Sequence, residues 1–359
     1  MGIGGSLNTT TDLLKNTVGN PPIRIGGYRS VTDRFWIIRL GLLIQLNCRF
    51  WDNADMLNRR TFLGCAAATA AMPLAAKPTA VRLGGPVFLK SDDPAAIAKE
   101  HRRLGYSAAY CPAATVKDKD RIKAIIKAFH DENVVIAEVG AWKNMLDPDA
   151  ELRRANIEYV TERLALAEEV GARCCVDIAG SFNPKVWYGP HKDNLSKRFF
   201  DATVENVRKV VDAVKPTRTT FTVEMMGWNL PDSPDNYLRL IKAVDRSGFA
   251  VHLDICNIIN SPAKFYDSRA VIEESFKKLG KWIMSCHAKD LAFVPEMNVH
   301  FVEVIPGRGE LDYGSYLTEL AKLPQDAPLM LEHLKSAEEY DEGRAYIQKV
   351  AQQSGVMFA

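Results

Sequence analysis

The sequence predicts a single-domain α/β protein with the (β/α)8 barrel fold, also called the TIM barrel. From Val81 onward, eight short apolar or β-rich runs alternate with longer segments whose apolar residues recur at helical spacing. The alternation extends over about 280 residues, a length typical of this fold. A doubly wound open sheet would also alternate, but the count of eight and the lack of a glycine-rich phosphate loop after the first strand favour the barrel.

The predicted elements follow one another in a regular order. The eight strands are expected at residues 81–88, 106–111, 134–140, 173–179, 219–225, 249–254, 282–288 and 328–332. Three helix starts are predicted where a capping Asp or Ser precedes a proline, because proline is tolerated in the first helical turn. These starts are Asp93-Pro94, Asp147-Pro148 and Ser233-Pro234.

The N-terminal part differs in sequence pattern from the predicted barrel. Residues 56–79 hold Arg59-Arg60, a short apolar run and an alanine-rich end, and they resemble a twin-arginine export signal. This resemblance implies a periplasmic or otherwise exported protein. The alternative is an N-terminal helix that stays attached, with a cytoplasmic location. Residues 1–55 are interpreted as a non-native or disordered extension, and residues 80–355 as the barrel.

Composition and charge exclude several classes of protein. The apolar stretch 35–51 is interrupted by Arg39 and is shorter than the ~20 residues of a membrane span, so no stable membrane insertion is expected. The net charge of the whole chain is +2. Residues 1–77 hold nine Lys/Arg and four Asp, so the remainder carries a net charge of −3, which argues against a nucleic-acid partner. The cysteines show no C-x-x-C spacing and are expected to be buried thiols. Homo-oligomerisation is left open.

Four ionisable residues stand at the ends of four successive predicted strands: Glu224, Asp254, His287 and Glu332. The C-terminal ends of barrel strands meet at one rim, where barrel enzymes carry their chemistry. Three carboxylates and one imidazole at that rim are a ligand set for a divalent metal ion. Strands five and eight are expected on opposite sides of the mouth, so that the two glutamates approach the ion from two faces.

The residues around these positions resemble the xylose isomerase-like family of sugar isomerases and epimerases. The segments that carry the resemblance are VEMMGW, HLDICN, SCHAKD, PGRGELDY and LEHL, and it covers about residues 80–350. It implies that the four residues bind Mn²⁺, or alternatively Mg²⁺, Co²⁺ or Zn²⁺, and that Glu224 and Glu332 act as the catalytic acid and base. One departure is Asn257, because ketose epimerases of this family typically carry a His there.

The chemistry expected of such a site starts with proton abstraction. A metal bound to a carbonyl oxygen and a neighbouring hydroxyl stabilises the enediolate formed when a base removes the α-proton. Epimerisation, isomerisation, and loss of a β-substituent by a lyase or dehydratase share this step. The expected partner is therefore a small carbohydrate, a sugar or keto-sugar derivative, or for a lyase a keto-inositol. An endonuclease-like phosphodiesterase and a non-catalytic sugar-binding barrel are the less favoured alternatives.

Further residues are predicted to contact the substrate from the same rim. Each also has a purely structural interpretation: a solvated carboxylate, aromatic packing under a loop, a salt bridge or a surface turn. They are Glu138, Trp142, Trp228, Asn257, Lys289 and Arg308. His252 is predicted to be a core residue or a partner that orients a ligand. Residues 291–312 form a long connection, which is typical of functional loops.

Overall fold

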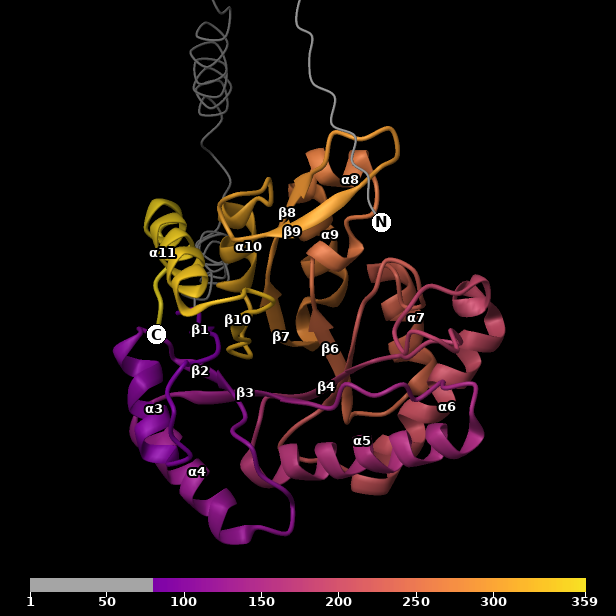
Figure 1. Cartoon of the computed structure of the whole chain (residues 1–359), viewed down its shortest axis with the longest axis horizontal. Coiled ribbons are helices and arrows are strands. Elements are labelled where there is room, and N and C mark those ends of the chain that lie inside the picture. The colour runs from indigo at the N-terminus through magenta and orange to yellow at the C-terminus, as the bar shows by residue number, and fades with distance from the viewer. Residues whose placement is uncertain (1–79) are drawn as a thin grey trace, which may run out of the picture. The chain divides into compact units, whose positions relative to one another are not determined.

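Eight parallel strands close into a barrel in residues 80–359, the part of the chain that the computed structural model describes (Figure 1). The order around the barrel is β1-β10-β7-β6-β5-β4-β3-β2, which confirms the predicted fold class. The barrel strands are β1 (Leu83–Gly84), β2 (Ala108–Tyr110), β3 (Val135–Gly140), β4 (Cys174–Ile178), β5 (Phe221–Glu224), β6 (Phe249–Leu253), β7 (Ile283–Ala288) and β10 (Leu329–Leu331). The predicted extension (1–55) and export signal (56–79) lie outside the described residues.

Helices connect successive strands and lie outside the barrel (Figure 1). They are α3 (Pro94–Arg103), α4 (Lys119–Asp131), α5 (Ala150–Val170), α6 (Lys197–Val214), α7 (Pro234–Val244), α8 (Pro262–Tyr266), α9 (Ser268–Leu279), α10 (Tyr313–Leu320) and α11 (Ala337–Ser354). None of the helices in residues 80–359 combines the length and apolarity that a membrane crossing requires.

Two of the three predicted helix caps are present and one is displaced. Asp93 caps α3 and Ser233 caps α7, each before a proline. Helix α5 begins two residues later than predicted, because Asp149 accepts hydrogen bonds from the backbone N–H groups of Glu151 and Leu152. Asp147 instead accepts from the backbone N–H of Asp149, and so forms a turn before the helix.

The strands that carry the four ionisable residues end together. Glu224 is the last residue of β5, and Asp254 and Glu332 directly follow β6 and β10. His287 is the last residue but one of β7, and it lies beside Met330 in the parallel register. Because parallel barrel strands share one C-terminal rim, all four residues lie at the same end of the barrel.

Glu224 and Glu332 are closer around the barrel than predicted. Strands β5 and β10 are separated by β6 and β7, three steps around a barrel of eight. The expectation that the two glutamates face each other from opposite sides is therefore wrong. Asp254 and His287, carried by the two intervening strands, lie between them.

Two buried tyrosines tie outer helices to these strands. The hydroxyl of Tyr237 in α7 lies 2.7 Å from the carbonyl oxygen of Val223 and 2.8 Å from that of Ala250. The hydroxyl of Tyr316 in α10 donates to the carbonyl oxygen of His287 at 3.0 Å. Both rings are fully buried in the apolar layer between strands and helices. The rim is thus held by packing and by backbone hydrogen bonds.

The long connection after β7 has structure of its own. Strands β8 (Asp290–Phe293) and β9 (Phe301–Val304) form an antiparallel hairpin that projects beyond the barrel strands, beside α8 and α9 (Figure 1). Phe265 in α8 packs on Phe293 and Phe301, with ring centroids 5.8 and 5.0 Å apart. This packing fixes the hairpin above one side of the barrel mouth.

All five cysteines of the described residues are free, and four of them are buried. This agrees with the predicted role as small apolar core residues.

Candidate metal centre

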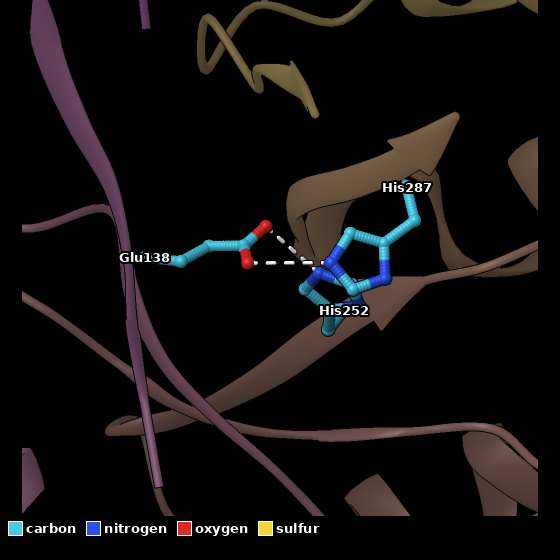
Figure 2. A group of neighbouring side chains, drawn as sticks. All are labelled: Glu138, His252 and His287. Carbon is cyan, nitrogen blue, oxygen red and sulfur yellow. Dashed lines mark hydrogen bonds and ion pairs between the residues drawn. The ribbon is translucent and has the colours of Figure 1, made fainter. Parts of the chain in front are cut away.

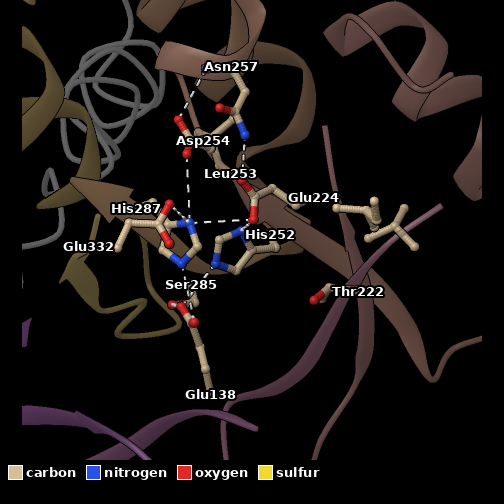
Figure 3. Close-up of polar contacts among 12 residues, drawn as sticks. Glu138, Thr222, Glu224, His252, Leu253, Asp254, Asn257, Ser285, His287 and Glu332 are labelled. Carbon is tan, nitrogen blue, oxygen red and sulfur yellow. Dashed lines mark hydrogen bonds and ion pairs between the residues drawn. The ribbon is translucent and has the colours of Figure 1, made fainter. Parts of the chain in front are cut away.

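The four strand-end residues come together in one cluster at the barrel mouth (Figure 3). Glu224, Asp254, His287 and Glu332 each offer one ligand atom, and these atoms all lie within 4.8 Å of one another. Nδ1 of His287 is 2.8 Å from Oε1 of Glu332, 3.4 Å from Oε2 of Glu224 and 3.7 Å from Oδ2 of Asp254. Such spacing leaves the four atoms facing one common point.

The chemistry of these atoms fits a divalent ion. Oδ2 of Asp254, Nδ1 of His287 and Oε1 of Glu332 are buried and make no hydrogen bond of regular geometry within residues 80–359; their close neighbours are one another and Nζ of Lys289. Buried polar atoms normally have such a partner, because desolvation without one is unfavourable. A cation at the point that these atoms share would bind all three of them. Three oxygen ligands and one nitrogen suit Mg²⁺, Mn²⁺ or Zn²⁺.

Lys289 supplies a positive charge at the same carboxylates. Its Nζ lies 2.9 Å from Oδ2 of Asp254 and 2.7 Å from Oε1 of Glu332, and its side chain is buried. Burial alone would lower the pKa of Lys289, but the surrounding carboxylates outweigh burial and raise the pKa well above its usual value. Lys289 therefore remains an ammonium donor beside the candidate ligands.

Two of the acidic ligands, Asp254 and Glu332, remain ionised despite their burial. Burial raises the pKa of Asp254, but Lys289 and His287 outweigh this effect and hold it well below its usual value. The pKa of Glu332 is lowered in the same way, by His287 and Lys289 against burial. A carboxylate must be deprotonated to bind a metal ion, so both groups are ready to act as ligands.

A buried glutamate holds the histidines below the cluster (Figure 2). Nε2 of His252 is 2.9 Å from Oε1 of Glu138, and Nε2 of His287 is 3.3 Å from Oε2. The hydroxyl of Ser285 also donates to Oε1. Because an ionised carboxylate only accepts hydrogen bonds, both imidazoles present Nε2–H to Glu138. Nδ1 of His287 therefore faces Glu224, Asp254 and Glu332.

Glu138 lies deeper than predicted. Strand β3 continues to Gly140, two residues beyond Glu138, so Glu138 lies below the rim from which it was predicted to contact the substrate. Burial raises its pKa, but His252 and His287 outweigh burial and lower the pKa well below its usual value. Glu138, His252 and His287 also lie close enough to form a three-ligand group. The separations from Glu138 to the two histidines are those of hydrogen bonds, and we interpret them as such.

Asn257 also belongs to the cluster. Its side-chain amide donates to Oε1 of Glu224, and its Oδ1 accepts from Nζ of Lys289 at 3.3 Å. Its backbone N–H donates to Oδ1 of Asp254 at 3.2 Å. Asn257 thus orients the carboxylates of Glu224 and Asp254 and the ammonium group of Lys289. An amide does this without gaining or losing a proton.

The other predicted contacts lie farther out. Trp142 and Trp228 are partly exposed on the loops after β3 and β5, and the indole N–H of Trp228 donates to the carbonyl of Tyr188 at 2.8 Å. Arg308 forms two hydrogen bonds of 2.7 Å with Glu342 and lines a cavity of about 190 Å³ together with Lys289 and Glu332.

Asp177 and His300 have local structural roles. Asp177 is fully buried and accepts backbone N–H groups of Lys143 and Ile178. His300 is exposed near the tip of the β8–β9 hairpin, beside Glu296.

The K-D and P-G-R-G motifs form one structural unit. The carboxylate of Asp290 accepts the backbone N–H groups of Gly307, Gly309 and Leu311 at 2.8, 3.1 and 3.0 Å. A Cβ atom on Gly309 would lie 2.3 Å from Oδ1 of Asp290, so only glycine permits this approach. The hydroxyl of Tyr313 donates to the carbonyl of Lys289 at 2.8 Å. Together these contacts fix the backbone that presents Lys289.

Residues 99–350 match the family described as xylose isomerase-like TIM barrel. The chain belongs to this family. No curated protein matches the chain significantly. The family assignment confirms the resemblance carried by the strand-end motifs, and the closed barrel is its fold.

Solved structures with the same fold come from proteins of different activities. One is the apo form of a 3-keto-D-glucoside 4-epimerase from E. coli, at 12% identity and TM-score 0.55, which covers 75% of this chain and 99% of that one. Another is endonuclease IV from Thermus thermophilus, at 16% identity and TM-score 0.57, with coverage of 76% and 99%. A third is a xylose isomerase-like TIM barrel protein from Mycobacterium smegmatis in complex with magnesium, at 19% identity and TM-score 0.53, with coverage of 72% and 88%. At these identities the likeness establishes the fold alone.

Proposed function

We propose that the protein is a divalent-metal-dependent isomerase or epimerase that acts on a sugar or keto-sugar derivative. The observation that carries the proposal is the meeting of Glu224 and Glu332 at the same buried point as Asp254 and Nδ1 of His287. Two ionisable carboxylates beside a metal position are what proton removal and return at a carbon next to a carbonyl require.

The position of each residue in the cluster determines its proposed role. A bound divalent ion supplies positive charge to the substrate carbonyl and the neighbouring hydroxyl, which makes the α-proton acidic. Asn257 donates a hydrogen bond to Glu224, and Lys289 pairs with Glu332. The two glutamates reach the substrate from β5 and β10, which are separated by β6 and β7. One glutamate removes the α-proton and the other delivers a proton from another direction. Lys289 offers N–H donors at the same point, and together with His287 it lowers the pKa of Glu332.

Lyase or dehydratase activity on a keto-sugar or keto-inositol is the second candidate. It begins with the same proton abstraction, and the four clustered residues serve it equally well. Two further alternatives are less well supported. A phosphodiesterase of the endonuclease type uses several metals and more histidine ligands, whereas the four-residue cluster has one histidine. A non-catalytic sugar-binding barrel would not need two glutamates at one metal position.

The remaining assignments are part of the proposal. Mn²⁺ is the proposed ion, with Mg²⁺, Co²⁺ and Zn²⁺ as alternatives, because the mixed oxygen and nitrogen ligand set accommodates each. Export to the periplasm is proposed from Arg59-Arg60 and the apolar, alanine-rich stretch that follows. N-terminal sequencing of protein from the native host tests it, with an expected mature end near residues 76–80 and an intact residue 1 as the contrary result.

The test of the activity uses Glu224→Gln and Glu332→Gln, with Glu296→Gln at an exposed site as control. Free ketoses, 3-keto sugars and keto-inositols are incubated with Mn²⁺ in deuterated water, and deuterium incorporation is followed by NMR. Loss of a general base lowers the exchange rate about 10²- to 10⁴-fold. In an epimerase, each variant retains exchange into one epimer and loses the other. Wild-type rates in both variants would exclude these glutamates as the acid and base.

A further inference from the structure

A closed ring of four side chains borders the cavity beside the metal cluster. Nζ of Lys289 lies 2.7 Å from Oε1 of Glu332 and 3.5 Å from Oε1 of Glu303. Nδ1 of His333 lies 2.8 Å from Oε2 of Glu303, and its Nε2 is 3.7 Å from Oε2 of Glu332. The ring therefore joins the residue that follows β7, strand β9 and the two residues that follow β10, and one of its members, Glu332, is a candidate metal ligand.

The backbone of His333 is unusual at this point. Its φ is +59°, in the left-handed region that residues other than glycine rarely adopt. Such conformations persist where surrounding contacts hold them, and they cluster at functional sites. Here the left-handed turn directly follows Glu332 and directs the imidazole toward Glu303 on the hairpin. The side chains of His333 and Glu303 remain 58% and 41% exposed, so both keep polar atoms available to a ligand.

The size of the cavity suits part of a sugar. Its volume is about 190 Å³. A single water molecule needs roughly 10–15 Å³ of such space, so the cavity has room for several hydroxyl-bearing carbons. This matches the hydroxyl-bearing end of a sugar whose carbonyl end lies at the metal cluster.

The charges around the cavity favour an uncharged ligand. Its lining includes the cations Lys289, Arg308 and Lys335 and the carboxylates Glu303, Glu332 and Glu339. Arg308 is held by Glu342, and Lys289 by Asp254 and Glu332. The three cations and three carboxylates balance, so the lining offers no excess of charge to an ionic ligand, whereas hydroxyl groups can both donate to the carboxylates and accept from the cations.

We propose that Glu303 and His333 form a subsite for the distal hydroxyl groups of an uncharged sugar substrate. This inference rests on the proposed function and extends it, because it names the part of the substrate that the β8–β9 hairpin recognises. Glu303 accepts a hydrogen bond from one hydroxyl of the sugar, and the His333 imidazole forms a hydrogen bond with the adjacent hydroxyl. The subsite thus selects for chain length and against phosphorylated sugars.

The test compares two ketoses that differ in their distal hydroxyls. Dihydroxyacetone has the α-hydroxyketone but no hydroxyls beyond it, whereas D-fructose has them. Exchange of α-protons with deuterium is measured by NMR with Mn²⁺ for the wild type, Glu303→Gln and His333→Asn. Asn is chosen because it tolerates a left-handed backbone. The matched controls are Glu296→Gln and His300→Asn, an exposed glutamate–histidine pair on the same hairpin.

The ratio of kcat/KM for D-fructose to that for dihydroxyacetone is the deciding quantity. Loss of a hydrogen bond to a charged group should lower this ratio about 10- to 100-fold in Glu303→Gln, and His333→Asn should lower it in the same direction. The two controls keep the wild-type ratio. An unchanged ratio in the subsite variants, or an equal fall in the control pair, overturns the subsite.

A separate binding experiment distinguishes failure of the subsite from failure of the proposed function. If the wild type exchanges neither ketose, the proposed activity on these compounds fails. The subsite is then tested by binding alone, with saturation-transfer NMR of D-glucitol and D-glucitol 6-phosphate. Weaker binding of D-glucitol to Glu303→Gln and His333→Asn than to the controls supports it. Equal binding by all variants, no binding to the wild type, or tighter binding of the phosphate overturns it.

Discussion

Nε2 of His252 lies 2.9 Å from Oε1 of Glu138, although the two residues are 114 positions apart in the chain. The same carboxylate is 3.3 Å from Nε2 of His287. Glu138 thus connects a histidine of the candidate metal centre to one that lies deeper in the barrel. A carboxylate that accepts from a ligand imidazole fixes its tautomer and its orientation, and strengthens it as a metal ligand.

Glu138→Gln should weaken metal binding without removing a ligand. The variant keeps side-chain size but loses the negative charge that the two imidazoles donate to, and such losses typically lower metal affinity about 10- to 100-fold. Calorimetric titration of metal-free protein with Mn²⁺ measures the dissociation constant. Glu151→Gln, at an exposed position, is the control. Equal affinities in the two variants would mean that Glu138 does not orient His287.

His287→Ala should abolish most metal binding. The wild type is expected to hold about one divalent ion per chain, because the four ligand atoms meet at one point. Elemental analysis after purification in excess Mn²⁺ measures the content. His300→Ala, an exposed histidine on the hairpin, should retain the wild-type value. Full metal content in His287→Ala would remove this residue from the ligand set, and two ions per wild-type chain would point to binding at Glu138 as well.

Chelation should lower the melting temperature of the wild type. An ion that binds only the folded state stabilises it by about 2.7 kcal/mol when present at 100 times its dissociation constant. Thermal unfolding is therefore compared with Mn²⁺ and with EDTA. In His287→Ala the two curves should coincide. A wild-type melting temperature that is the same with Mn²⁺ and with EDTA would contradict a site of useful affinity.

Asp177→Asn should remove a pH-dependent loss of stability. Burial, only partly offset by the backbone N–H groups of Lys143 and Ile178, raises the pKa of Asp177 well above its usual value. The folded state therefore binds a proton that the unfolded state releases above about pH 4, so stability falls as pH rises from there toward the folded pKa. Asn imitates the protonated carboxyl and has no such loss.

The measurement for Asp177 is denaturant unfolding at pH 5 and pH 8. The free energy of unfolding of Asp177→Asn should exceed that of the wild type by more at pH 8 than at pH 5. Asp120→Asn, whose side chain is 98% exposed, serves as control and should show no such trend. A difference that shrinks with rising pH would show that Asp177 is ionised in the folded protein.

The positions of Glu224, Asp254, His287 and Glu332 were predictable from local sequence. Each stands at the end of a short apolar run, and parallel barrel strands end at one rim. Side-chain alternation also places His252 and Ser285 on the same strand faces as Asp254 and His287. These are properties of single strands, so they can be read without knowing which strands are neighbours.

The partners of these residues were decided by the tertiary structure. Glu138 meets His252 only because the barrel closes, which depends on the register of every strand between them. Glu303 reaches Lys289 and His333 only because residues 290–304 fold back as a hairpin. Local propensity sets the ends and the faces of strands. Contacts across a barrel arise from closure and packing over more than a hundred residues, and no short segment of the sequence carries that information.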